Sequence, residues 1–224
     1  METAFSAPNG LTLRNEPRDF PEWHLGRPHY ALWALEVDVP ALRQRVAAAA
    51  RHLSGLLLPD YCRQPHVTLS LCGFPGACPE HADDFGVAAL AAQLAALRHA
   101  QPRPFDIEVG ALASFTSAPY LAVQNAGGQI AALRQCLAGG SLNDFYDAYT
   151  PHVTVGLYAD AWPMPEVQVR LASFADREAL RLRIPGISLL SYASARIGGE
   201  LACMARYDFQ SETLHWTASQ PYPF

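Results

Sequence analysis

The sequence predicts a two-lobed, pseudo-symmetric protein of strands and helices, because one unit of secondary structure and one short motif each occur twice. The motif Pro-His-Val-Thr ends both units, with its histidine at His66 in the first and His152 in the second. The step from Trp33 to His66 is 33 residues and the step from Leu121 to His152 is 31, so the units have nearly the same length. Two copies of one unit in one chain imply two similar lobes.

The first unit is expected to be a strand, a helix, a loop and a second strand. Residues 29–38 are apolar and strand-like, and Pro40 then begins an alanine-rich stretch that predicts a helix. A loop with Asp60 and Tyr61 follows. Residues 65–74 are rich in β-branched and apolar side chains and should form the strand that carries the first motif.

The second unit repeats this plan after a predicted helix near residues 85–99 and an extended segment at 104–115. Its expected elements are a strand at 120–125, a helix at 127–138 ended by Gly139 and Gly140, and a strand at 151–158. Asp147 and Tyr149 precede the second motif much as Asp60 and Tyr61 precede the first. The loops therefore agree in kind as well as in position.

The last third of the chain is expected to add to one of the two sheets. A helix around residues 166–174 precedes two strand candidates, 180–194 and 200–209, which a Gly198–Gly199 turn joins. The domain boundaries follow from these elements. We expect an N-terminal arm at 1–28 anchored by Phe20 and Trp23, a single bilobal domain at 29–208, and a C-terminal tail at 209–224 that carries Trp216, Tyr222 and Phe224.

Composition bounds the class of protein. Half of the 224 residues are hydrophobic and 17% are charged, which is typical of a compact folded chain. The formal net charge of −5 argues against an extended nucleic-acid-binding surface, since such proteins carry a basic field that neutralises many phosphates. A small nucleotide or the terminal phosphate of an RNA fits better as the substrate.

Cysteine number and the absence of a signal sequence predict a cytoplasmic protein. The five cysteines are odd in number and unevenly spaced, which indicates free thiols. The first ten residues lack the basic start and apolar core of a secretory signal, and no apolar stretch approaches the roughly 20 residues that span a bilayer. Nothing in the sequence predicts the oligomeric state.

The repeated motif places a histidine and a threonine on one face of each strand. Residues two apart in a strand point to the same side, so His66 lies beside Thr68 and His152 beside Thr154. Two imidazoles titrate near neutral pH and suit the proton transfers of phosphodiester cleavage. Threonine hydroxyls can donate hydrogen bonds to the non-bridging phosphate oxygens. The pattern predicts a two-histidine phosphodiesterase.

These motifs, at residues 65–71 and 151–157, resemble those of the 2H phosphoesterase superfamily, specifically its 2′-5′ RNA ligase-like branch. The resemblance covers roughly residues 29–208. It implies an α+β fold in which two antiparallel sheets flank a central cleft with helices outside. It also implies action without a metal or other cofactor on 2′,3′-cyclic phosphates, 2′-5′ linkages or related cyclic nucleotides. We transfer the catalytic and phosphate-binding roles only to the histidine and threonine of each motif.

Two other functions remain open. The same cleft would serve a non-catalytic protein that binds a nucleotide or an RNA end, although the completeness of both motifs favours turnover. RNA 2′-5′ ligation is the reverse reaction of such a site. A zinc site built from His66 and Cys62, Cys72 and Cys78 is disfavoured, because no pair of these residues has the tight spacing of a structural site.

Further cleft residues follow from strand parity and local composition. Counting by twos reaches Ser70 from His66 and Tyr158 from His152, and Tyr158 would stack on a base or ribose. Arg63 lies three residues before His66 and is a candidate phosphate contact. Residues 23–33 are dense in aromatic and basic side chains, and from them we expect three to border the cleft: Arg27, Tyr30 and Trp33.

Overall fold

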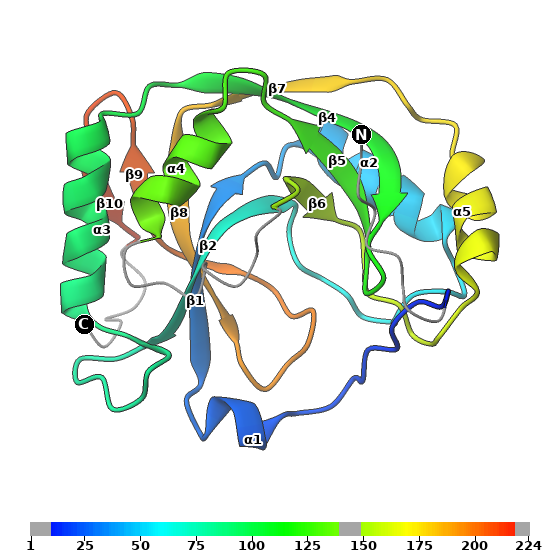
Figure 1. Cartoon of the computed structure of the whole chain (residues 1–224), viewed down its shortest axis with the longest axis horizontal. Helices are drawn as coiled ribbons and strands as arrows, with labels where there is room; N and C mark the ends of the chain where they lie inside the picture. Colours follow the sequence, from blue (N-terminus) through cyan, green and yellow to red (C-terminus); the bar gives the residue numbers. More distant parts are fainter. Residues whose placement is uncertain (1–9, 139–148, 218–224) are drawn as a thin grey trace.

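The computed structural model describes residues 10–138 and 149–217 and has an α+β fold (Figure 1). The strands in these ranges are β1 His29–Glu36, β2 His66–Pro75, β3 Asp84–Phe85, β4 Phe105–Ser114, β5 Pro119–Gln124, β6 His152–Thr154, β7 Leu180–Ile184, β8 Gly186–Ala193, β9 Ala202–Asp208 and β10 Thr213–Trp216. The helices are α1 Pro21–His24, α2 Pro40–His52, α3 Val87–Ala100, α4 Gln129–Leu137 and α5 Met164–Ala172.

Two sheets form the body of the protein, as predicted. The six-stranded sheet has the order β10-β9-β8-β1-β2-β3, and the four-stranded sheet has the order β6-β5-β4-β7. All neighbouring strands are antiparallel except β2 and β3. Strands β2 and β6 contact each other, so the two motif strands meet where the sheets adjoin near the centre of Figure 1.

The internal repeat is present in the structure. Strand β1, helix α2 and strand β2 form the first unit, and β5, α4 and β6 form the second. The register agrees as well, since Glu36 is paired with His66 and Ala122 with His152, and both pairs have the same separation in sequence. Each motif histidine therefore occupies the same place in an antiparallel strand pair.

Apolar side chains hold the sheets and helices together in one large core, and a second, small cluster contains Leu32, Ala34 and Leu190. Trp33 and Leu121, from the first strands of the two units, are both fully buried in this core. The indole nitrogen of Trp33 donates to the side-chain oxygen of Gln93 on α3 at 2.8 Å, which satisfies the one polar atom of the ring. Pro40 occupies the first turn of α2, where its missing backbone donor costs nothing.

The segment at 180–194 differs from the prediction. It splits at Pro185 into β7, which joins the four-stranded sheet, and β8, which joins the six-stranded sheet. Because proline lacks a backbone N–H group, it interrupts the strand ladder at the point where the chain passes between sheets. The C-terminal strands thus extend both sheets rather than one.

The second motif strand is also shorter than predicted, because β6 ends at Thr154. Beyond it the backbone bonds once to the first residue of β5 and then to the loop before β2. Val155 donates to the carbonyl of Pro119 at 2.9 Å, and the carbonyl of Leu157 accepts from Leu58 at 2.8 Å. The second motif therefore lies on a short edge strand.

The expected arm and tail both contact the body. Thr12 donates its backbone N–H to Trp162 at 2.8 Å, and Trp23 packs on Phe74 with ring centroids 5.0 Å apart. Strand β10 lies within the expected tail and pairs with β9. Several residues of the sequence prediction lie outside the described ranges: Gly139, Gly140, Asp147, Tyr222 and Phe224.

Candidate active site

His66 begins β2 and is only 8% exposed. Its ring nitrogen Nδ1 lies 2.8 Å from the backbone carbonyl oxygen of Gln64. A carbonyl oxygen accepts hydrogen bonds and does not donate them, so Nδ1 must carry the proton. The other ring nitrogen, Nε2, is left to act in chemistry.

His152 begins β6 and repeats this arrangement. Its Nδ1 lies 2.8 Å from the carbonyl oxygen of Thr150, again two residues before the histidine. The rings of Phe115 and Tyr120 contact the imidazole edge to face, with centroids 4.9 and 5.4 Å from it. Backbone and aromatic contacts together fix the ring orientation and assign the free position to Nε2.

A tyrosine from each unit reaches the motif of the other unit. The Tyr149 hydroxyl, from the loop before β6, donates to the backbone carbonyl of Thr68 on β2. Tyr61, from the loop before β2, lies near the side chain of Thr154, which acts to lower the pKa of Tyr61.

Burial lowers the pKa of both histidines. Desolvation is the largest cause for His66, the bond to Gln64 acts against it, and the charges of Arg63 and His152 act with it; together they lower the pKa from 6.5 to about 4. Burial also lowers the pKa of His152, while its bond to Thr150 acts in the opposite direction. The charge of His152 contributes to the lowered pKa of His66, and the strands that begin with these two histidines contact each other.

Arg63 is the sequence-predicted cation that lies near this pair. Its guanidinium lies over the Tyr192 ring, 4.0 Å from the centroid, and its Nε donates to the carbonyl of Gly199 at 3.3 Å. It also affects the pKa of His66. A guanidinium held by an aromatic face and a carbonyl keeps donors for a phosphate oxygen.

Two residues that strand parity placed in the cleft are fully buried. Ser70 is 0% exposed, because β2 contains a bulge: Trp33 is paired with Ser70 but Ala34 with Thr68, which leaves one extra residue on β2. Tyr158 is also 0% exposed and shares a 2.6 Å hydrogen bond with Ser114. Tyr158 lies beyond the end of β6, where parity no longer applies.

The three residues expected from the aromatic segment have structural contacts. Trp33 is buried in the core, and Tyr30 is 4% exposed within an aromatic cluster that includes Phe74. Arg27 donates to the carboxylates of Asp83 and Asp84, at 2.6 Å in each case. The ion pairs of Arg27 anchor the 79–85 loop, and the contacts of the three side chains do not include His66 or His152.

The sequence did not predict the contacts that two tyrosines and an aromatic pair make with the motif residues. In the sequence, Tyr61 and Tyr149 show only that the loops before the two motifs are similar. The structure shows that each tyrosine reaches the motif of the other unit. Phe115 and Tyr120 gave no signal, since their stacking beside His152 depends on the pairing of β4 with β5.

Within the described ranges, no group of three or more His, Cys, Asp or Glu side chains is arranged to hold a metal ion. All five cysteines are free. No helix in this part of the chain has the length and apolar character to cross a membrane.

Comparison with known proteins identifies relatives of this arrangement. The model of the 2′-5′ RNA ligase superfamily matches residues 35–196, which include both motifs. No curated protein sequence matches the chain.

Three solved structures share the fold at low sequence identity. TT0787 of Thermus thermophilus has 14% identity and a TM-score of 0.50, over 81% of this chain and 98% of that chain. Escherichia coli LigT complexed with 3′-AMP has 12% identity and a TM-score of 0.50, over 82% and 98%. A phosphoesterase has 12% identity and a TM-score of 0.51, over 81% and 98%.

Proposed function

The chain belongs to the 2′-5′ RNA ligase superfamily, and on that premise we propose that it is a metal-independent phosphodiesterase with His66 and His152 as its acid/base pair. Its substrate is a 2′,3′-cyclic phosphate, a 2′-5′ linkage or a related cyclic nucleotide. The observation that carries the proposal is the matched bond from each Nδ1 to a backbone carbonyl, which leaves Nε2 free on both rings.

In this mechanism one imidazole takes a proton from the attacking water and the other gives a proton to the leaving oxygen. We assign the base to His66, because its pKa of about 4 keeps the ring neutral near pH 7. His152 is then the acid. The negative charge of a bound phosphodiester raises the pKa of a nearby imidazole, which favours the protonated His152 that this role requires.

The threonines and Arg63 hold the phosphate between the rings. Thr68 and Thr154 are half-buried and each lies two residues after its histidine, so their hydroxyls can donate to the non-bridging oxygens. Arg63 supplies positive charge beside His66. Neutral donors and one fixed cation stabilise the negative charge on the non-bridging oxygens as the water attacks phosphorus.

Two alternatives use the same residues. A protein that binds a nucleotide or an RNA end would keep the phosphate contacts without turnover. An RNA 2′-5′ ligase would run the reaction in reverse, since the same acid and base serve both directions. The complex of Escherichia coli LigT with 3′-AMP supports a small nucleotide as the ligand in either case.

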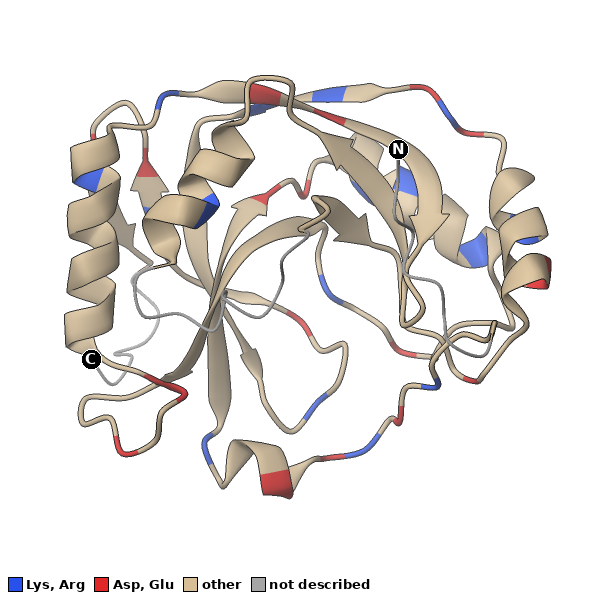
Figure 2. Cartoon of the chain, in the orientation of Figure 1, with Lys and Arg blue, Asp and Glu red and all other residues tan. Residues whose placement is uncertain are grey.

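We also propose a cytoplasmic protein without an extended nucleic-acid-binding surface. The five free cysteines support a reducing compartment. Figure 2 shows arginines and acidic residues interspersed along the described elements, which agrees with the net charge of −5. Binding a terminal phosphate requires fewer positive charges on the protein than binding a long duplex does.

A substrate panel tests the function. The protein is incubated with 2′,3′-cyclic nucleotides, 2′-5′ dinucleotides and bis-phosphates, with and without a chelator. Turnover is expected and should survive chelation, because imidazoles move the protons and hydroxyls stabilise the charge. Tight binding without turnover would support the binding protein, and loss of activity with chelator would contradict the metal-independent mechanism.

A further inference from the structure

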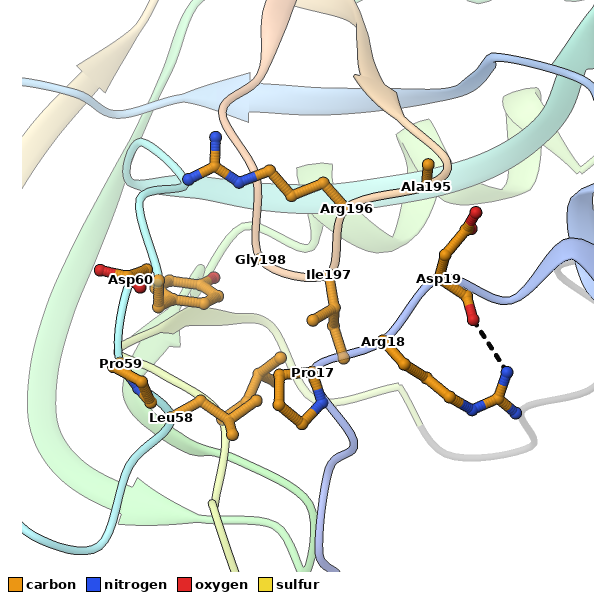
Figure 3. Close-up of a pocket in the computed structure, with 12 residues that line it drawn as sticks. Pro17, Arg18, Asp19, Leu58, Pro59, Asp60, Ala195, Arg196, Ile197 and Gly198 are labelled. Carbon is orange, nitrogen blue, oxygen red and sulfur yellow. Dashed lines mark hydrogen bonds between the residues drawn. The ribbon is translucent and has the colours of Figure 1, made fainter.

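A cavity of about 240 Å³ is formed partly by the loop that precedes β2 and the first motif (Figure 3). Three chain segments enclose it: residues 17–19 of the arm, the loop 58–61 before β2, and the turn 195–198 between β8 and β9. Leu157 completes the lining. The volume is sufficient for one heterocyclic base.

Tyr61 connects this cavity to the catalytic residues. Tyr61 lines the cavity and also lies near the side chain of Thr154, which acts on its pKa. Leu157 follows Thr154 by three residues. The cavity is therefore about one tyrosine side chain away from the phosphate that Thr154 would hold, which is the separation between a phosphate and the base of an attached nucleoside.

The lining has the chemistry of a base-binding site. Pro17, Leu58, Pro59 and Ile197 present apolar surface, and the Tyr61 ring adds an aromatic one (Figure 3). A flat heterocycle gains from burial against such surfaces and from stacking.

Two charged side chains at the cavity are available to a ligand. Neither Asp60 nor Arg196 forms an ion pair with another residue of the described ranges. Asp60 has φ of 62°, in the left-handed region that costs energy for a residue with a side chain. A carboxylate only accepts hydrogen bonds, so Asp60 favours a base with an exocyclic amino group.

The walls of the cavity are fixed before any ligand binds. Cys62 donates its backbone N–H to Gly198 at 3.0 Å, and Gln64 exchanges two hydrogen bonds with the backbone of Leu201, at 2.8 and 3.2 Å. A Cβ atom on Gly198 would lie 2.8 Å from the Tyr61 ring, and the φ of Gly198 is +66°. Only glycine permits this close approach, which seats the Tyr61 ring against the turn.

We propose that this cavity binds the base of a second nucleoside, joined to the first through the scissile phosphate, so that the substrate is a linked dinucleotide or an RNA end. This inference rests on the proposed function and narrows its substrate. Residues 17–19 precede the region 35–196 that matches the family model, so one wall of the subsite belongs to the arm of this chain.

The test compares two substrates in one cavity-filling variant. Ala195 is an exposed residue of the cavity lining, so Ala195→Trp fills the cavity without disturbing the core. The values of kcat/KM are measured for 2′-5′-linked diadenosine monophosphate and for 2′,3′-cyclic AMP. We expect a loss of roughly tenfold or more for the dinucleotide and a change within about twofold for the cyclic nucleotide. Ala88→Trp, at an exposed position on α3, is the matched control and should change neither.

Equal losses on both substrates, or no loss on either, would overturn the subsite. A wild type that cleaves neither substrate contradicts the proposed function instead. The cavity is then tested by the affinity for the same dinucleotide, which Ala195→Trp must weaken by a similar factor while Ala88→Trp does not. Unchanged affinity in Ala195→Trp would overturn the subsite.

The base preference gives a second test of the same inference. Glycine adopts a positive φ readily, so Asp60→Gly removes the carboxylate without backbone strain. The ratio of kcat/KM for the adenine and uracil dinucleotides should fall by about fivefold to tenfold. An unchanged ratio would show that Asp60 does not contact the base.

Discussion

The two motif histidines share their local geometry and differ in their surroundings. In both, Nδ1 is bonded to the carbonyl two residues earlier at 2.8 Å. His66 begins a ten-residue strand inside the six-stranded sheet, whereas His152 begins a three-residue strand at the edge of the four-stranded one. The duplicated unit gives both histidines the same tautomer. Their different surroundings set the pKa of each histidine separately.

This difference is useful in a reaction that needs one acid and one base. His66 is 8% exposed and faces the charge of Arg63, so burial and charge both favour its neutral form. His152 is half-buried between aromatic rings, and no nearby cation is among the causes of its lower pKa. One histidine type thus serves two roles through its environment.

Loss of either imidazole should have the largest effect. His66→Ala and His152→Ala are each expected to lower kcat by roughly 10² to 10⁴, the usual scale for general acid or base catalysis. The double variant should lose little more than the worse single variant, because the two groups act as a unit. Steady-state rates on the best substrate of the panel measure all three.

An exposed histidine provides the control. His99→Ala, near the end of α3, should leave kcat unchanged. If one motif histidine were dispensable while the other was essential, the paired mechanism would be wrong, and the site would use a single imidazole.

The pH dependence should expose the assignment of base and acid. In the free enzyme, His66 must be neutral and His152 protonated, so kcat/KM should rise as pH passes about 4 and begin to fall at a pH below 6.5, where His152 loses its proton. Below the lower pKa and above the higher one, kcat/KM should change about tenfold per pH unit. Because bound phosphate raises both pKa values, the profile of kcat should lie at higher pH than that of kcat/KM.

Values of kcat/KM measured at closely spaced pH values between roughly 3 and 9 would cover both limbs and test this assignment. A kcat/KM profile that keeps rising above neutral pH would contradict the lowered pKa of His152. A monotonic profile would argue against a two-histidine mechanism altogether.

The threonines should matter less than the histidines. Thr68→Ala and Thr154→Ala each remove one neutral donor and leave both proton-transfer groups, so a loss of about tenfold in kcat/KM is expected. Thr→Ser at either position keeps the hydroxyl and should recover most of the activity. A Thr→Ser variant as poor as the alanine variant would indicate a packing role instead.

The sequence alone predicted the repeat, the strand order within each unit and the motif residues, because local periodicity and proline placement carry that information. It did not predict which additional side chains reach the site. A bulge on β2 breaks the parity that pointed to Ser70, and the early end of β6 leaves Tyr158 in the core. The Trp33 side chain contacts Gln93 on α3. Contacts of this kind depend on tertiary packing, which a local sequence pattern does not reveal.

Tyr61 and Tyr149, which each reach the motif of the other unit, should give the smallest difference in activity between the two half-sites. Tyr61 lies near the side chain of Thr154, whereas the Tyr149 hydroxyl donates to the backbone carbonyl of Thr68. Burial raises the pKa of Tyr61 to about 12, so its hydroxyl stays protonated near neutral pH and is available to orient that of Thr154.

Tyr61→Phe keeps the ring and should lower kcat by about threefold to tenfold, the worth of one hydrogen bond. In a Thr154→Ala background the same change should have no further effect on kcat, since the hydroxyl that Tyr61 orients is gone. Tyr149→Phe should instead lower the free energy of unfolding by about 1 kcal/mol with kcat nearly unchanged, because its bond holds backbone. Equal effects of the two variants on kcat would mean that the half-sites position phosphate in the same way, and that their difference lies in the histidines alone.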